Sequence, residues 1–407
     1  MAETGGPGLE AFRAEARAWL QANYPPALRQ ADPPSDPEAV WGGRAFAGSQ
    51  DPQIVWMRRM AERGWTAPTW PRAYGGGGLS AAEAQVLAEE MAAGQFREPL
   101  YSFGILMLGP ALLEYASEAQ KLAHLPRIVR GEVRWCQGYS EPGAGSDLAA
   151  LATRCEDKGD HWLINGSKIW TSYADKADWC FCLVRTDASA KHGGISFVLI
   201  DMATPGVETR PIPLISGESP FCETFFTDVK VPKQNLVGQV NGGWEIAKRL
   251  LQYERRNISA SFGGGGTVGG VAGDIASIAK AYVGLDAEGR LADPDLRARI
   301  TRNKMDFQAL ALTLARSEAE AAAGGGVSAA TSIVKVAAAA FAQERSELVV
   351  EAMGAQGLGW EGQDFSGLEI AAVRGWLRAK ANSIEGGTSE INLNVVAKRV
   401  LGLPDPV

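Results

Sequence analysis

The sequence has little of the material that metal centres and disulfide scaffolds require. Its 407 residues include only three histidines and five cysteines, and no two cysteines have the C-x-x-C spacing. A histidine-rich metal centre, a Ser-His-Asp triad and a structural zinc site are therefore not expected, and the odd cysteine count argues against a disulfide framework. We predict no metal site and structural roles for His124, His161 and His192, and the cysteine usage fits a reducing cytoplasm.

Long apolar runs and an excess of positive charge are also missing. No run approaches the roughly 18 apolar residues that mark a membrane helix. The net charge of −7 gives no general basic face for a nucleic acid. Residues 1–20 carry early acidic residues and lack the apolar core of a secretory signal, and the chain does not end in a Ser-Lys-Leu address. We therefore expect a cytoplasmic protein without a membrane span or a nucleic-acid partner.

The composition is that of a globular protein, 46% hydrophobic and 21% charged, and the length suffices for two or three packed units. Periodicity divides the chain into residues 1–130, which are helical, 131–240, which read as short strands, and 241–407, which are helical again. The helices are expected at Leu9–Ala22, Pro52–Arg63, Ser80–Ala93, Trp244–Phe262, Asp293–Glu320, Ser328–Met353 and Ser389–Leu401.

The middle zone predicts a small β-barrel or sandwich. Its expected strands are His161–Ser172, Trp179–Arg185, Gly194–Met202, Val207–Ile215 and Cys222–Val231. Asn165 and Gly166 interrupt the first of these runs, and an Asn-Gly pair between apolar runs predicts a tight hairpin turn there.

Three segments have the residue types of a cofactor site. The first, WCQGYSEPGAGSD at Trp135–Asp147, ends a short apolar run in a turn rich in backbone and hydroxyl donors. The second, KIWTSYADKADW, begins at Lys168 and places Trp170 and Ser172 two residues apart, so in a regular strand they face the same side. The third, SIEGGTSEINLNVVAKRVLGLP from Ser383, joins glycines to a helix start, where free N–H groups favour an anion.

A carboxylate on an apolar helix stripe is a candidate base. Glu254 follows Leu251 by three residues and precedes Ile258 by four, so it shares their stripe. Burial would raise its pKa toward the range of a general base. The spacing equally allows a glutamate that forms an ion pair with Arg255 or Arg256, and spacing alone does not decide between the two roles.

These three segments resemble, over most of the chain, the signatures of the acyl-CoA dehydrogenases. The resemblance implies an α+β fold with an N-terminal helical domain, a central β-barrel or sandwich domain and a C-terminal four-helix bundle. It also implies FAD as cofactor and oxidation of an acyl-CoA thioester to a trans-2-enoyl-CoA, as in the β-oxidation of fatty acids. Electrons would pass to an electron-transfer flavoprotein, and the enzyme would be a homo- or heterotetramer in a bacterial cytoplasm.

The resemblance also implies site residues. The residues that correspond to cofactor contacts are Gln137, Ser140, Ser146, Trp170, Ser172, Thr388 and Glu390. Ser146 and Arg255 would contact the substrate as well. Many members have their catalytic glutamate where this chain has Gly386, whose backbone N–H would still polarise the thioester carbonyl. A minority place the base on the helix before an arginine, which favours Glu254, with Glu385 as the runner-up.

Other features remain open. Residues 267–302 and 351–357 depart from the usual pattern, as in large subunits of two-gene enzymes of the pimeloyl-CoA and steroid side-chain type, so a second dehydrogenase subunit is a further expected partner. An acyl-CoA oxidase that uses oxygen and a flavin-binding structural subunit are the alternative functions. Gly264, Gly266 and Gly269 fit G-x-G-x-x-G, but a helical pattern precedes them, so we interpret them as a glycine-rich break.

Overall fold

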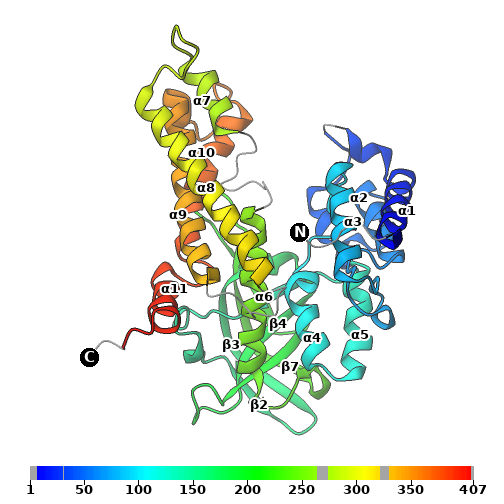
Figure 1. Ribbon diagram of the computed structural model, residues 1–407. Helices are drawn as coiled ribbons and strands as arrows, with labels where there is room; N and C mark the ends of the chain where they lie inside the picture. The colour runs from blue at the N-terminus through cyan, green and yellow to red at the C-terminus, as the bar shows by residue number, and fades with distance from the viewer. Residues whose placement is uncertain (1–6, 31, 264–273, 321–329, 405–407) are drawn as a thin grey trace. The chain divides into compact units, whose positions relative to one another are not determined.

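The computed structural model describes residues 7–30, 32–263, 274–320 and 330–404, and for residues 7, 254–263, 318 and 330–332 it describes the backbone alone (Figure 1). The chain divides into two compact units. The first comprises Met1–Ile212 and Pro220–Leu250, and the second comprises Pro213–Ser219 and Leu251–Val407. No helix among the described residues has the length and apolar character that crossing a membrane requires.

The first unit begins with a group of helices, coloured blue to cyan in Figure 1. They are α1 (Pro7–Asn23), α2 (Pro52–Glu62), α3 (Ala81–Ala93), α4 (Gly109–Tyr115) and α5 (Glu118–Val129). Ser80 starts α3 with a capping box, in which its side chain accepts from the N–H of Glu83 and Glu83 reaches back. The segment between α2 and α3 packs through buried Trp65 and Trp70.

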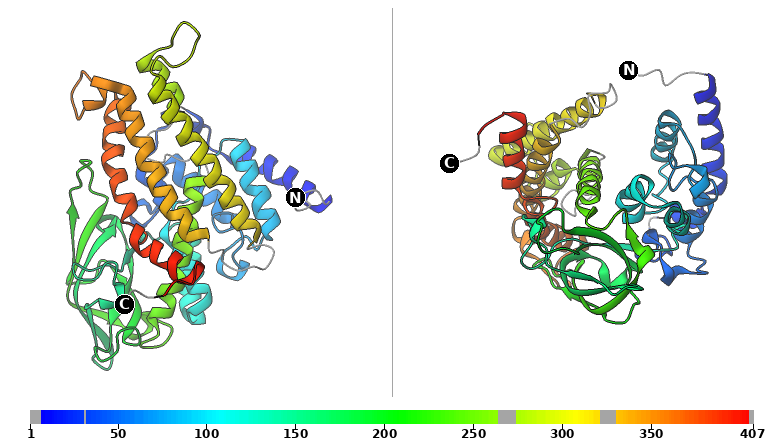
Figure 2. Two further views of the ribbon diagram at one scale, coloured as in Figure 1. Left: turned by 60° about the vertical axis from the view of Figure 1, so that its left-hand side comes forward. Right: turned by 90° about the horizontal axis from the view of Figure 1, so that it is seen from below.

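Eight strands form one sheet in the same unit. They are β1 (Trp135–Gly138), β2 (Arg154–Asp157), β3 (His161–Ser172), β4 (Trp179–Arg185), β5 (Ile195–Asp201), β6 (Val207–Ile212), β7 (Phe221–Pro232) and β8 (Leu236–Val237). The order is β6-β7-β3-β2-β4-β5-β8, with β1 beside β4. The sheet curls, as the right-hand view of Figure 2 shows, around a core that contains all five cysteines, each of them buried and unpaired.

The predicted hairpin at Asn165–Gly166 is wrong. Both residues lie inside β3, which continues past them to pair with β7. The turn that joins β2 to β3 contains Gly159 instead, at φ 89°. Gly166 is glycine for another reason, since a Cβ there would lie 2.7 Å from the Cα of Thr153. Asn165 exchanges hydrogen bonds with Asp228, whose φ of 50° marks an irregularity in β7.

The second unit is helical, like the last zone of the sequence. Its helices are α7 (Ile275–Val283), α8 (Pro294–Glu320), α9 (Ala330–Met353), α10 (Gly367–Ala379) and α11 (Ser389–Val395), together with the last residues of α6 (Gly243–Gly263). α7, α8, α9 and α10 surround a core that includes Ile278, Ile300, Leu348 and Ala372. Along the chain, helices are followed by a sheet and then by helices again. This is the order expected for an acyl-CoA dehydrogenase, and it confirms the predicted fold class.

Candidate functional site

The first site segment comprises β1 and the turn that comes after it. Gln137 pairs in register with Phe181 of β4, and it is the one residue of β1 that is only half-buried. Ser140 lies two residues beyond the strand, where its carbonyl accepts a hydrogen bond from the N–H of Ile169 at 2.9 Å. The end of β1 is thereby fixed to β3, and the side chains of Gln137 and Ser140 have no hydrogen-bond partner among the described residues.

A tight turn follows Ser140. Glu141 and Ala144 exchange backbone hydrogen bonds of 3.0 Å, which closes the turn around Pro142 and Gly143. Neither Gly143 nor Gly145 has an atom within 4 Å of where a Cβ would stand, and neither has positive φ. The packing of this chain therefore does not require glycine at either position, and the exposed turn leaves its backbone open to a ligand.

The second site segment is a bulge in β3. The register with β7 shifts between Lys168 and Thr171, and Trp170 has a φ of 60° in the left-handed region. The Trp170 side chain is 53% exposed and its indole meets Phe221 edge-on at 6.2 Å. Thr171 is fully buried, while Ser172 is half-buried and its hydroxyl has no described partner. The segment is therefore not the regular strand from which we predicted a shared face for Trp170 and Ser172.

The two segments adjoin through the Ile169–Ser140 hydrogen bond. Together they carry an exposed indole, the half-buried Gln137 and the hydroxyls of Ser140, Ser146 and Ser172, which have no partner among the described residues. An exposed large aromatic ring is a ready surface for a flat apolar group, and hydroxyls can donate to ring nitrogens and phosphate oxygens. With the open backbone at Gly143 and Gly145, this donor set fits a flavin nucleotide.

The third site segment lies in the second unit and turns sharply. Gly386 and Gly387 have φ angles of 63° and 88°, a region that glycine occupies without strain. Thr388 caps α11 by accepting from the N–H of Ile391 at 3.2 Å. A hydrogen bond from the backbone N–H of Glu390 itself, and a second from the Thr388 hydroxyl, lower the pKa of Glu390. The N–H of Gly386 donates to no described residue. The expected helix start at Thr388 is confirmed.

The runner-up base is engaged elsewhere. Glu385 forms an ion pair with Arg378 at 2.7 Å, and its side chain is 41% exposed. Glu254 and Arg255 lie in α6, where the structure describes their backbone but not their side chains. Ala247 and Leu250, which precede Glu254 on the predicted stripe, are fully buried.

We did not predict from the sequence that three charged residues near these segments are buried. Lys168 is fully buried and forms an ion pair with Glu141 beside the turn of the first segment. Lys335, on α9, is buried and its Nζ has no hydrogen-bond partner among the described residues. Lys168 and Glu141 stand within the KIWTS and SEPGAGSD strings, so their position in the motifs is the signal that could have found them. No local pattern marks Lys335.

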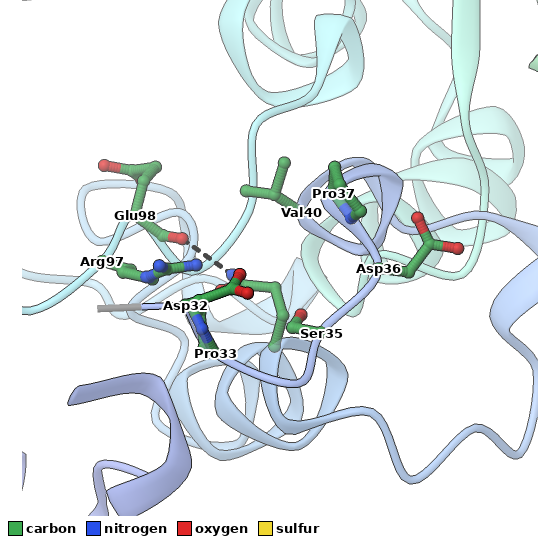
Figure 3. Close-up of a pocket in the computed structure, with 9 residues that line it drawn as sticks. Asp32, Pro33, Ser35, Asp36, Pro37, Val40, Arg97 and Glu98 are labelled. Atoms are coloured by element: carbon green, nitrogen blue, oxygen red, sulfur yellow. Dashed lines mark hydrogen bonds between the residues drawn. The ribbon is translucent and has the colours of Figure 1, made fainter. Parts of the chain in front are cut away.

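The remaining features to consider are a glycine-rich motif, His124 and a cavity in the first unit. The glycines Gly264, Gly266 and Gly269 lie outside the described residues. His124 packs edge-on against Trp135 and Trp179, and burial lowers its pKa to about 4, which is consistent with a structural role. A cavity of about 450 Å³ lies among the N-terminal helices, and Figure 3 shows its lining at Asp32, Asp36 and Glu98, with Gln53 donating to the Glu98 carbonyl at 2.9 Å. No residue assigned to the cofactor or substrate lines it.

Sequence comparison identifies the family. Family models described as the N-terminal, middle and C-terminal domains of acyl-CoA dehydrogenase match residues 7–132, 136–229 and 241–401. The acyl-CoA dehydrogenase IpdE1 of Mycobacterium tuberculosis is 34% identical over 398 residues, which cover 97% of this chain and 98% of that protein.

Solved structures show the same fold along the whole chain. A structure described as the Tcur3481-Tcur3483 steroid ACAD has a TM-score of 0.75 and 28% identity, and the match covers 100% of both chains. The ChsE4-ChsE5 complex from Mycobacterium tuberculosis has a TM-score of 0.72 and 28% identity, again over 100% of both chains. From the domain matches and the full-length similarity to IpdE1, this protein belongs to the acyl-CoA dehydrogenase family and is an oxidoreductase of that type.

Proposed function

We propose that this protein is an FAD-dependent enzyme that converts a saturated acyl-CoA to the trans-2-enoyl-CoA and passes the electrons to an electron-transfer flavoprotein. The observation that carries the proposal is the shared area of the turn after β1 and the Trp170 bulge, where an exposed indole adjoins partnerless hydroxyls. Family membership supports the reaction type, and the donor set supports the cofactor.

The residues of the first unit bind and orient the cofactor in this proposal. Trp170 would pack on the isoalloxazine, with Gln137 and Ser140 beside it, and Ser172 would donate to a ring nitrogen. Ser146, exposed after the turn, would donate near the flavin phosphate and the acyl-CoA. When bound, the flavin would supply the acceptor for the hydride that leaves the β-carbon. Thr388 and Glu390, at the start of α11, would be further cofactor contacts by their correspondence to the family motif.

Removal of the α-proton falls to Glu254. A thioester α-proton is weakly acidic, so the base must act while a donor polarises the carbonyl. The N–H of Gly386, which donates to no described residue, supplies that donor, and glycine adopts the left-handed φ at this position without strain. Arg255, next to the base, orients the substrate. The ion pair of Glu385 with Arg378 supports Glu254 over the runner-up.

The substitution Glu254→Gln tests the assignment. Turnover should fall by about 10²- to 10⁴-fold, because the amide cannot accept the proton, while the protein retains FAD by its visible absorption. Glu385→Gln is the matched control, with turnover close to wild type. Full activity in Glu254→Gln together with loss in Glu385→Gln would show that the base is Glu385.

The acyl group and the partner are further parts of the proposal. Similarity to a structure described as a steroid ACAD supports a bulky acyl group. Similarity to the ChsE4-ChsE5 complex supports a heterotetramer with a second dehydrogenase subunit. Light scattering should then show a homo-oligomer smaller than the active assembly. Anaerobic bleaching of the flavin by a panel of acyl-CoAs identifies the acyl class, and the same assay in air separates a dehydrogenase from an oxidase.

The cellular setting and the domain boundaries remain predictions. Five unpaired thiols, all buried, support a reducing bacterial cytoplasm. We propose domain boundaries near residues 130 and 240, where the helical and strand-rich zones of the sequence meet.

A further inference from the structure

A buried ion pair connects the two segments that carry the proposed flavin contacts. Lys168 is 0% exposed and Glu141 is 9% exposed, and Nζ of Lys168 lies 2.7 Å from Oε1 of Glu141. The same Nζ donates to the carbonyl oxygen of Tyr139 at 3.2 Å. Glu141 follows Ser140 in the chain and Lys168 precedes Trp170 by two residues, so the pair joins the two segments on which the cofactor contacts lie.

The carboxylate of Glu141 also holds the far end of the loop that begins at the turn. Its Oε2 accepts from the N–H of Ala152 at 2.6 Å, and its Oε1 accepts from the N–H of Thr153 at 2.9 Å. The loop between Glu141 and Thr153 contains Ser146, the proposed phosphate contact. One carboxylate therefore fixes both ends of this loop, and Lys168 ties it to the Trp170 bulge.

Stability alone does not account for such a pair. Burial raises the pKa of Glu141, but Lys168 and the donors around the carboxylate outweigh burial and leave the pKa below its usual value. A buried ion pair gains little over well-packed apolar residues of the same size, because both charges lose their hydration. What the pair supplies and an apolar pair does not is a fixed direction for each hydrogen bond.

We propose that Lys168 and Glu141 form a positioning pair that sets the alignment of the Ser140–Ser146 turn with the Trp170 bulge, so that both segments meet the flavin together. The inference rests on the proposed function, since it concerns the same cofactor. Neither residue touches the cofactor in this role.

The test compares FAD affinity with folding stability in three variants. Lys168→Met leaves a buried carboxylate without its counter-charge, so this variant should lose both FAD affinity and folding stability. The double variant Lys168→Met/Glu141→Gln removes both charges and should recover the thermal stability to within a few degrees, yet its FAD dissociation constant should stay at least tenfold above wild type. Its visible flavin band should also shift.

Glu141→Asp provides a conservative variant. It keeps the charge, but the side chain is one methylene shorter, so it cannot reach Lys168 and the N–H groups of Ala152 and Thr153 at once. We expect a folded protein whose FAD dissociation constant is raised about tenfold, equivalent to about 1.4 kcal/mol. Lys158→Met, at an exposed ion pair with Glu156 on the same sheet, is the matched control and should leave the FAD affinity unchanged.

Wild-type FAD affinity and spectrum in the double variant or in Glu141→Asp would overturn the inference. Failure of both to fold would also overturn it, because the pair would then be a requirement for stability. If instead the proposed function is wrong, the wild-type protein itself would bind no FAD, and this result distinguishes the two failures.

Discussion

Two lysines, one in each unit, are almost inaccessible to solvent, and their surroundings differ. Lys168 in the sheet has a carboxylate at 2.7 Å and a carbonyl at 3.2 Å. Lys335 in α9 is 5% exposed, and its Nζ has no hydrogen-bond partner among the described residues. Burial lowers the pKa of Lys335, while the carboxylates of Glu385 and Glu390 act in the opposite direction and only partly offset it.

The contrast extends to the segments beside each lysine. The turn after β1 is held by a buried carboxylate and by backbone pairing, and its glycines are not required by the fold. The turn before α11 is shaped by Gly386 and Gly387 in the left-handed region, and its ion pair, Arg378 with Glu385, is exposed. One segment is fixed by polar contacts, whereas the other is fixed by backbone conformation, and the lysine beside it has no hydrogen-bond partner among the described residues.

The largest expected effect is at Lys335. Replacing it with Met removes a buried ammonium group that makes no hydrogen bond to the described residues, and should stabilise the protein by about 2 kcal/mol at neutral pH. Because the pKa is lower in the folded state than its unfolded value of about 10.4, the wild-type penalty is complete below the folded pKa. The advantage of Met should therefore shrink as the pH rises toward 10.4.

Urea unfolding of the protein at pH 7 and pH 10 measures this difference. Lys304→Met on α8 is the control, because Lys304 is half-exposed and paired with Asp274, so its loss should change stability by less than about 0.5 kcal/mol. A destabilised Lys335→Met would show that the lysine has a partner in solution, and the contrast with Lys168 would then disappear.

The next effect concerns the glycines of the two turns. Gly386→Ala should lower the free energy of unfolding by about 1 kcal/mol, because alanine at a φ of 63° is strained. Gly143→Ala should cost less than about 0.5 kcal/mol, since its φ is not positive and a Cβ there meets no atom within 4 Å. Both values come from denaturant midpoints without cofactor, and equal losses would contradict the distinction.

Long periodic segments could be predicted from the sequence, and short or non-local features could not. The expected helices at Asp293–Glu320 and Ser328–Met353 correspond to α8 and α9, because a sustained 3.6-residue period is a strong signal. The helices α7 and α10 were missed, since a short helix is stabilised mainly by the core it joins. Asn165 and Gly166 have the local chemistry of a turn, but pairing of β3 with β7 decided their conformation.

The candidate site divides in the same way. Motif strings singled out Ser140, Trp170 and Thr388, and the roles proposed for them follow from the resemblance to the family. The pairing of Lys168 with Glu141 joins residues 27 positions apart, and only the path of the chain between β1 and β3 brings them together. The bulge at Trp170 was also missed, because a register shift depends on the partner strand.

The smallest expected effect is at the exposed pair of Arg378 and Glu385. Glu385→Gln should cost less than about 1 kcal/mol, because solvent screens an exposed ion pair and ordering two long side chains opposes it. The loss should fade between 0.05 and 1 M salt, a range in which the Debye length shrinks to about 3 Å. Arg378→Gln should behave in the same way, and thermal unfolding at both salt concentrations measures both variants. Because the Lys168–Glu141 pair is buried, the cost of Lys168→Met should not depend on salt. A salt-independent loss above about 2 kcal/mol in Glu385→Gln would mean that the C-terminal turn also depends on a desolvated charge pair.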